Sequence, residues 1–156
     1  MRREPVTAYV GLGANLGDAR SAVLAAAQAL GGLPETRLLA VSPLYRTAPV
    51  EATGPDYVNA VAGLETGLTA PALLDALLAL EAAAGRERPY RNAPRTLDLD
   101  LLLYGSGRID SPRLVVPHPR MWDRGFVLVP LADLAPQRVP PERLAAMTSQ
   151  VMARIP

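Results

Sequence analysis

Apolar and polar positions change their spacing several times along the chain, and each change predicts a new element. Apolar residues recur at helical spacing over 20–30 and 71–84. Asp18 suits the N-cap of the first helix, and Pro71 suits the first turn of the second. Apolar stretches bounded by Gly, Pro or polar residues predict strands, which cover 8–13, 37–42, 57–66, 96–104 and 126–128, with an extended segment at 44–47.

Two further details follow from the same pattern. Residues 57–66 alternate in a way that predicts a strand with one buried face. Near the C-terminus, we expect a helical turn over 130–134 and a last helix over 142–153, which follows two prolines.

The order of the main elements is β-α-β-β-α-β followed by a C-terminal extension. This is the ferredoxin-like pattern, an α+β fold in which an antiparallel sheet carries helices on one face. A length of 156 residues fits one domain, and the sequence contains no internal repeat or linker. We therefore expect residues 1–156 to form a single domain.

Composition excludes several classes of protein. Hydrophobic residues make up 49% of the chain, but no apolar run reaches the roughly 18 residues that a membrane span needs. The absence of cysteine excludes disulfides, thiolate catalysis and cysteine-ligated zinc. The formal net charge of +1 gives no general attraction for nucleic acid. With no recognisable signal peptide, we expect a cytoplasmic protein without membrane or nucleic-acid partners.

All sixteen basic residues are arginine. Chemistry built on lysine, such as Schiff bases or the P-loop lysine, is therefore excluded. A coding bias explains the missing lysine, but it does not explain where the arginines lie. Eight of them fall between residues 86 and 124, with only five acidic residues. This stretch is either a solvated charged loop or a set of guanidinium groups that bind phosphate.

The strongest local pattern is the segment 95–102, RTLDLDLL. In a strand, Asp98 and Asp100 point to the same side and the intervening leucines to the other. The pair is either the solvated face of an amphipathic strand or a site for a cation, which is arginine or a metal. Oxygen ligands favour Mg²⁺ or Ca²⁺ over zinc, and two carboxylates with substrate phosphates commonly hold Mg²⁺. Beside an arginine-rich loop, this arrangement fits phosphoryl transfer.

The remaining candidates are less specific. His118, the single histidine, could be a base, a phosphate donor, a surface residue or a third metal ligand. Tyr57, Asn59 and Phe126 could line a small-molecule pocket, although aromatic residues at such positions more often belong to the core. The glycines of 11–17 do not have the spacing of a dinucleotide-binding fingerprint.

In order and spacing, the motifs resemble those of the 6-hydroxymethyl-7,8-dihydropterin pyrophosphokinase family over residues 9–136. The matching segments are 11–17 (GLGANLG), 45–47 (YRT), 56–60 (DYVNA), 95–100 (RTLDLD), 116–118 (VPH) and 124–126 (RGF). The resemblance implies a monomer that transfers pyrophosphate from ATP to 6-hydroxymethyl-7,8-dihydropterin in folate biosynthesis. The products would be AMP and the pterin diphosphate.

The resemblance also implies roles for individual residues. Asp98 and Asp100 would bind two Mg²⁺ ions, and the catalytic residues would be Arg86, Arg95 and Asp98. The residues that would bind ATP are Arg88, Arg95, Leu101, Arg113, His118 and Arg124. The residues that would bind the pterin are Thr47, Ala48, Val50, Tyr57, Asn59, Asp98 and Phe126. Segments 51–56 and 86–94 would close over the site.

Two positions depart from the family pattern, and two other functions compete with it. Asn92 stands where many relatives have tryptophan, and Pro119 where an aromatic residue is common, which bears on loop closure and substrate affinity. Residues after 136 match weakly and suggest no role. A ferredoxin-like nucleic-acid-binding module would need aromatic-rich strands and a basic face, which the sequence lacks. An inactive scaffold would have no need for the arginine and aspartate motif.

Overall fold

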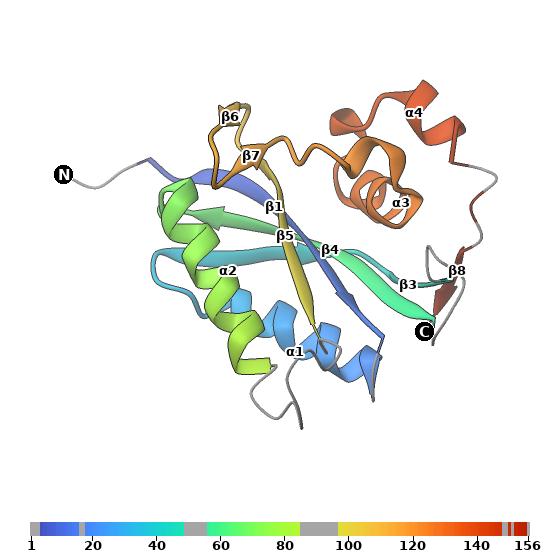
Figure 1. The fold of residues 1–156 in the computed structure, drawn as a ribbon, viewed down its shortest axis with the longest axis horizontal. Coiled ribbons are helices and arrows are strands. Elements are labelled where there is room, and N and C mark those ends of the chain that lie inside the picture. The colour runs from blue at the N-terminus through green and yellow to red at the C-terminus, as the bar shows by residue number, and fades with distance from the viewer. Residues whose placement is uncertain are drawn as a thin grey trace.

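The centre of the protein is a six-stranded antiparallel sheet (Figure 1). It is seen in a computed structural model that describes residues 4–15, 18–48, 56–84, 97–147, 150 and 152–155. The strand order is β5-β1-β4-β3-β8, and β2 also pairs with β4. The strands are β1 (Val6–Ala14), β2 (Thr36–Val41), β3 (Leu44–Thr47), β4 (Tyr57–Thr66), β5 (Asp98–Tyr104) and β8 (Met152–Ile155).

Two helices cover one face of this sheet (Figure 1). Helix α1 (Ala19–Gly31) connects β1 to β2, with β4 between them, and α2 (Ala70–Ala84) connects β4 to β5, with β1 between them. Right-handed crossovers of this kind place both helices on the same side. Their apolar faces meet the sheet in a core that includes Val10, Leu30 and Leu77, all fully buried. The expected βαββαβ order and ferredoxin-like fold are confirmed.

Asp18 caps α1 as expected. Its carboxylate accepts hydrogen bonds from the backbone N–H of Ser21 at 3.1 Å and from the Ser21 hydroxyl at 2.9 Å. Because both bonds favour the charged form, they lower the pKa of Asp18.

A further helix, α3 (Gly125–Leu134), packs on the opposite face of the sheet, so helices are not confined to one face. Its Leu128 and Leu131 are fully buried and share a cluster with Val61 of β4 and Leu102 of β5. Strand β4 therefore lies between two layers. The prediction of a single buried face for this strand was wrong, because α3 covers the second one.

The predicted strand over 126–128 was also wrong, since these residues belong to α3. A short apolar run such as FVLV is compatible with a buried strand and with a buried helix, and periodicity alone does not separate them. The helix begins where the N–H groups of Val127 and Leu128 both donate to the carbonyl of Arg124, each at 3.0 Å.

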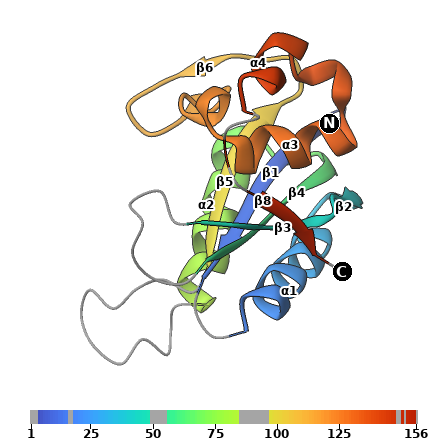
Figure 2. The same cartoon turned by 90° about the vertical axis from the view of Figure 1, so that its right-hand side faces the viewer.

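The predicted helix over 142–153 is replaced by two shorter elements. Helix α4 covers only Pro141–Ala145, and Met152–Ile155 forms β8. Strand β8 pairs antiparallel with β3, from Leu44 opposite Ile155 to Thr47 opposite Met152 (Figure 2). The edge of β3 offers backbone groups to this segment, and the pairing overrides local helix propensity.

A connection that the sequence did not predict leads from β5 to α3. It contains a small hairpin, β6 (Ile109–Asp110) and β7 (Val115–Val116), and the short helix η1 (Met121–Asp123). A second short helix, η2 (Pro136–Arg138), follows α3. Among the described residues, no helix combines the length and apolarity needed to cross a membrane.

Candidate active site

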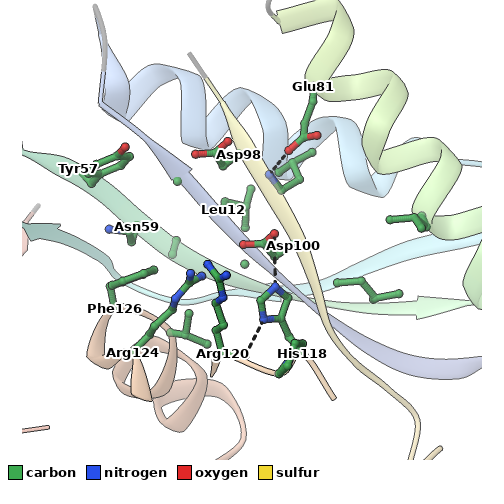
Figure 3. A pocket seen from close by; sticks show the side chains of 18 of the residues that line it. Leu12, Tyr57, Asn59, Glu81, Asp98, Asp100, His118, Arg120, Arg124 and Phe126 are labelled. Atoms are coloured by element: carbon green, nitrogen blue, oxygen red, sulfur yellow. Dashed lines mark hydrogen bonds and ion pairs between the residues drawn. The ribbon is translucent and has the colours of Figure 1, made fainter. Parts of the chain in front are cut away.

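A pocket of about 890 Å³ opens where β1, β4 and β5 meet the segment that runs from β7 into α3 (Figure 3). The predicted site residues that line it are Thr47, Ala48, Tyr57, Asn59, Asp98, Asp100, Leu101, Arg113, His118, Arg124 and Phe126. Pro119 lines it as well. The other predicted site residues, Val50, Arg86, Arg88 and Arg95, lie outside the described residues, as does Asn92. Of the two segments expected to close over the site, 86–94 lies outside the described residues entirely, and 51–56 does so except for Asp56.

The two aspartates reach the pocket because β5 alternates. Leu99 and Leu101 are buried in the core below α1 and α2, and Asp98 and Asp100 project from the other face. Across β1, Gly13 is opposite Asp98 and Gly11 is opposite Asp100. Neither glycine has a side chain to fill the space beside the carboxylate, so the glycine motif of β1 forms an open floor.

Opposite the aspartates, a set of side chains forms what we call the amide wall; it consists of Thr47, Tyr57, Asn59 and Phe126. The Asn59 side-chain N–H donates to the Thr47 hydroxyl at 2.7 Å, and both residues are buried. A Cβ atom at Gly13 would lie only 2.8 Å from Asn59 Oδ1, so glycine is needed there for Asn59 to keep its place.

The aromatic members of the amide wall are not simple core residues. Tyr57 and Phe126 are half-buried and line the pocket. The guanidinium carbon of Arg124 lies 5.4 Å from the centre of the Phe126 ring, which places a positive charge over the ring. A flat heterocycle with polar edges would find both stacking surfaces and hydrogen-bonding groups here.

Glu81 of α2 is a pocket residue that the sequence analysis missed. One of its carboxylate oxygens accepts a hydrogen bond from the backbone N–H of Leu99 at 2.7 Å (Figure 3). Leu99 stands between the two aspartates, and we call Glu81, Asp98 and Asp100 together the acid edge. No sequence signal could reveal this contact, because the partner is a backbone group. Arg120 is a second pocket residue that was missed.

His118 is held by two neighbours (Figure 3). Its Nδ1 accepts the backbone N–H of Arg120 at 3.2 Å, so the neutral ring carries its proton on Nε2, which lies 3.9 Å from Asp100 Oδ1. Burial lowers the pKa of His118, Arg124 and Arg120 lower it further, and Asp100 opposes them. With 22% of its side chain exposed, His118 is a positioned donor and not a surface residue.

Arg113 lies at the rim of the pocket. It follows β6 and forms an ion pair with Asp75 of α2, and both side chains are more than half exposed. A pair this exposed exchanges partners easily, so Arg113 remains accessible to an anionic ligand.

The donor atoms of the pocket fit a magnesium ion whose coordination is completed by oxygens of a phosphate group. Asp98 and Asp100 offer carboxylate oxygens on one face of a strand. Among the residues that the structure describes, His118 and the two aspartates do not come together as a group of three metal ligands. Two carboxylates and substrate oxygens are the usual magnesium environment.

Comparison with known proteins was informative at the level of sequence. Residues 9–136 match the family model described as 7,8-dihydro-6-hydroxymethylpterin-pyrophosphokinase (HPPK). The chain is 52% identical to the 2-amino-4-hydroxy-6-hydroxymethyldihydropteridine pyrophosphokinase of Pseudomonas aeruginosa, with 95% of this chain and 96% of that protein covered. It is 43% identical to the protein of the same name from Methylorubrum extorquens, over 85% of this chain and 84% of the other.

Solved structures agree at the level of the fold. A Plasmodium falciparum HPPK-DHPS crystal structure with pterin and p-hydroxybenzoate superposes with a TM-score of 0.59 at 12% sequence identity. The match covers 83% of this chain but only 39% of the Plasmodium chain. The common part of the two proteins is therefore the α+β domain described above.

Proposed function

The chain belongs to the 7,8-dihydro-6-hydroxymethylpterin-pyrophosphokinase family, and we propose that its acid edge and its amide wall divide the two substrates of the family reaction between them. That reaction is the transfer of pyrophosphate from ATP to 6-hydroxymethyl-7,8-dihydropterin, which gives AMP and the pterin diphosphate in folate biosynthesis. ATP is its co-substrate.

In our proposal, Asp98 and Asp100 hold two Mg²⁺ ions together with the triphosphate of ATP. The two carboxylates face one side of β5, and the glycines opposite them leave room for a bulky anion. Bound magnesium would supply positive charge against the triphosphate and polarise the phosphorus under attack. Glu81 orients the strand through the N–H of Leu99.

The pterin would lie against the amide wall. Asn59 offers donor and acceptor atoms at the edge of a heterocycle, and Tyr57 and Phe126 offer ring faces. Ala48 contributes to the same side of the pocket, and we propose the same for Val50, which lies outside the described residues. Asp98 is the member of the acid edge that lies toward Tyr57, close to where the hydroxymethyl group would reach the triphosphate (Figure 3).

ATP would contact the opposite rim of the pocket. Arg113, His118 and Arg124 offer guanidinium and imidazole donors, and Leu101 provides apolar surface. The hydroxymethyl oxygen attacks the β-phosphorus, the bond from that phosphorus to the α–β bridging oxygen breaks, and AMP leaves with the bonding electrons. The hydroxyl proton passes to water. Arg86 and Arg95 would neutralise charge that develops on the phosphates, and Arg88 would add a contact to ATP.

Catalysis in this scheme consists of positioning and electrostatic stabilisation. His118 is suited to donate from Nε2 because its lowered pKa keeps the ring neutral at pH 7. Because positioning and electrostatic stabilisation carry the catalysis, His118 need not act as a strong base.

We also propose that the protein acts as a cytoplasmic monomer without nucleic-acid or membrane partners. The near-neutral charge of +1 and the lack of cysteine agree with this proposal. Sedimentation of the purified protein should give a single species near 16.6 kDa. A larger species at micromolar concentration would contradict the monomer.

The observation that carries the substrate assignment is that one pocket contains both the Asp98–Asp100 pair and the Asn59–Thr47 hydrogen bond. The test is a product analysis with ATP, Mg²⁺ and 6-hydroxymethyl-7,8-dihydropterin. AMP should form in a one-to-one ratio with a pyrophosphorylated pterin. Formation of ADP would mean that a single phosphoryl group is transferred, and the proposed alignment on the β-phosphorus would be wrong.

A further inference from the structure

The C-terminal segment reaches the amide wall at two places although its sequence suggests no role. Gln150 lies at the start of α3, where the pocket residues Arg124 and Phe126 stand. Strand β8 pairs with β3, whose last residue, Thr47, belongs to the amide wall. Two contacts from one short segment therefore reach both sides of the proposed pterin site.

The first contact is made by the Gln150 amide. Its Oε1 accepts the backbone N–H of Gly125 at 2.8 Å, and its Nε2 donates to the carbonyl of Asp123 at 3.2 Å. The first N–H groups of a helix have no partner within the helix, and the N-cap residue Arg124 makes no side-chain cap. Gln150 thus supplies from a distant part of the chain a cap that the local sequence lacks.

The glycine at 125 is explained by the same contact. A Cβ atom there would lie 2.6 Å from Met152 Cε and 2.7 Å from Gln150 Oε1. The RGF motif therefore has glycine at a position where the C-terminal segment packs against the helix. This links a motif of the pocket to residues that lie outside the matched 9–136 region.

The second contact joins β8 to β3 and to α3. Thr47 pairs with Met152, and its hydroxyl holds the buried Asn59 amide. Nearby, Arg154 of β8 lies 3.7 Å from the carboxylate of Asp133 on α3, and its guanidinium carbon is 5.8 Å from the Tyr45 ring centre on β3. The Tyr45 hydroxyl donates to Asp133. The ends of β3 and α3 are thereby fixed relative to each other.

We propose that Gln150 and strand β8 form a positioning element for the amide wall, with Gln150 the residue that sets the start of α3 and hence the Phe126 ring. This inference rests on the proposed function, because it assumes that the amide wall binds the pterin. Strand β5, which carries the two aspartates of the acid edge, lies at the opposite end of the sheet from β8, so chemistry at the phosphates should be little affected when the element is loosened.

The test compares Gln150→Ala with wild-type protein in steady-state kinetics and in pterin binding to enzyme loaded with Mg²⁺ and a non-hydrolysable ATP analogue. Loss of one partly buried and one exposed hydrogen bond should weaken pterin binding about three- to tenfold, with kcat within about twofold. Gln150→Glu keeps an acceptor for the Gly125 N–H and should restore most of the affinity. Gln137→Ala, an exposed glutamine in η2, is the matched control and should behave as wild type.

A double-mutant cycle separates positioning from general loosening of the fold. Gly125→Ala should displace the Gln150 side chain, so its effect on pterin affinity should overlap with that of Gln150→Ala instead of adding to it. Folded Gln150→Ala protein with unchanged pterin affinity, or with kcat and both substrate affinities reduced alike, would overturn the inference alone. Wild-type protein that binds no pterin would overturn the proposed function and the inference with it.

Discussion

The amide wall and the acid edge are built in opposite ways. Thr47 and Asn59 belong to inner strands, are buried, and bond to each other. The two aspartates of the acid edge lie on β5 at the end of the sheet, where Asp98 is exposed and the Asp100 side chain is 45% exposed. One side of the pocket is thus fixed by packing between two helical layers, while the other presents charge to solvent.

This difference indicates how each half would contribute to the reaction. A buried hydrogen bond is formed before the ligand arrives, so the amide wall is suited to recognise the shape and edge of a heterocycle. Neighbouring carboxylates repel each other until a cation joins them, so the acid edge is completed by what it binds. Changes in the wall should therefore affect affinity, and changes in the edge should affect metal-dependent turnover.

The largest effect is expected for Asp100→Ala, which removes one carboxylate of the acid edge. Metal-dependent turnover should fall by more than about 10²-fold, because charge on the triphosphate is no longer neutralised. The fold should survive, since the Asp100 side chain is partly exposed and its contact with His118 is long, at 3.9 Å. Asp110→Ala, at an exposed aspartate of β6, is the control. Normal Mg²⁺-dependent activity in Asp100→Ala would refute the metal assignment.

The next largest effect is expected for Asn59→Ala in the amide wall. Pterin affinity should fall about 10- to 100-fold, and the free energy of unfolding should fall by about 1–3 kcal/mol because the Thr47 hydroxyl loses its buried partner. Calorimetry with the pterin and urea unfolding measure the two losses. Thr47→Val should be coupled to Asn59→Ala in a double-mutant cycle. If Asn59→Ala loses turnover but keeps its pterin affinity, the amide wall does not differ from the acid edge in the way proposed.

A smaller effect is expected at Glu81, which contacts the acid edge through the backbone. Glu81→Ala should raise the Mg²⁺ concentration for half-maximal activity about tenfold, because Leu99 loses the acceptor that fixes β5 between the aspartates. Glu81→Gln should be close to wild type, since its amide oxygen can still accept that N–H. The control is Glu142→Ala on α4, where the side chain is exposed. If the glutamine variant is as impaired as the alanine variant, the charge of Glu81 acts directly on the ligand.

The smallest effect concerns His118 and the pH dependence of stability in metal-free protein. Because the folded state lowers the pKa of His118, the unfolded chain binds a proton more readily. The free energy of unfolding should therefore fall as the pH drops below the ordinary value of 6.5, and it should not depend on this group above that value. His118→Asn should flatten the decline between pH 6.5 and about pH 5, above the range in which carboxylates titrate. If urea unfolding shows that the free energy of unfolding declines equally with pH in wild-type protein and in His118→Asn, the assignment of this decline to His118 is wrong.

Sequence patterns predicted most of the central fold. Strand 57–66 was predicted with the bounds that β4 has. The predicted helix 20–30 differs from α1 by one residue at each end, and 71–84 differs from α2 by one residue at its start. These elements have clear periods and clear ends, namely the Asp18 cap and the Pro71 start.

The two segments that were assigned the wrong type of element are those of α3 and β8, where local sequence does not decide the structure. The run at 126–128 is apolar on every side because α3 packs against the sheet and also against α4, and such a run has no readable period. The segment 152–155 became a strand because the edge of β3 was available to it, which is a tertiary effect.

The sequence revealed those site residues that belong to motifs with a specific order and spacing. It did not reveal the residues that act by binding backbone groups. Asp98, Asn59 and Phe126 occur in motifs and meet in one pocket. Glu81 and Gln150 act on the backbone N–H groups of Leu99 and Gly125, and a backbone group carries no sequence signature. Such contacts become visible only when the strands and helices are placed in space.

If the acid edge holds the metal that fixes ATP, then Mg²⁺ should strengthen nucleotide binding only when Asp98 and Asp100 are present. The affinity for a non-hydrolysable ATP analogue would be measured by calorimetry with and without Mg²⁺, in wild-type protein and in Asp98→Asn with Asp100→Asn. Wild-type protein should bind the analogue much more tightly with Mg²⁺, and the double variant should bind it equally weakly under both conditions. A double variant that keeps the full Mg²⁺ enhancement would contradict the account, because the metal would then be held elsewhere.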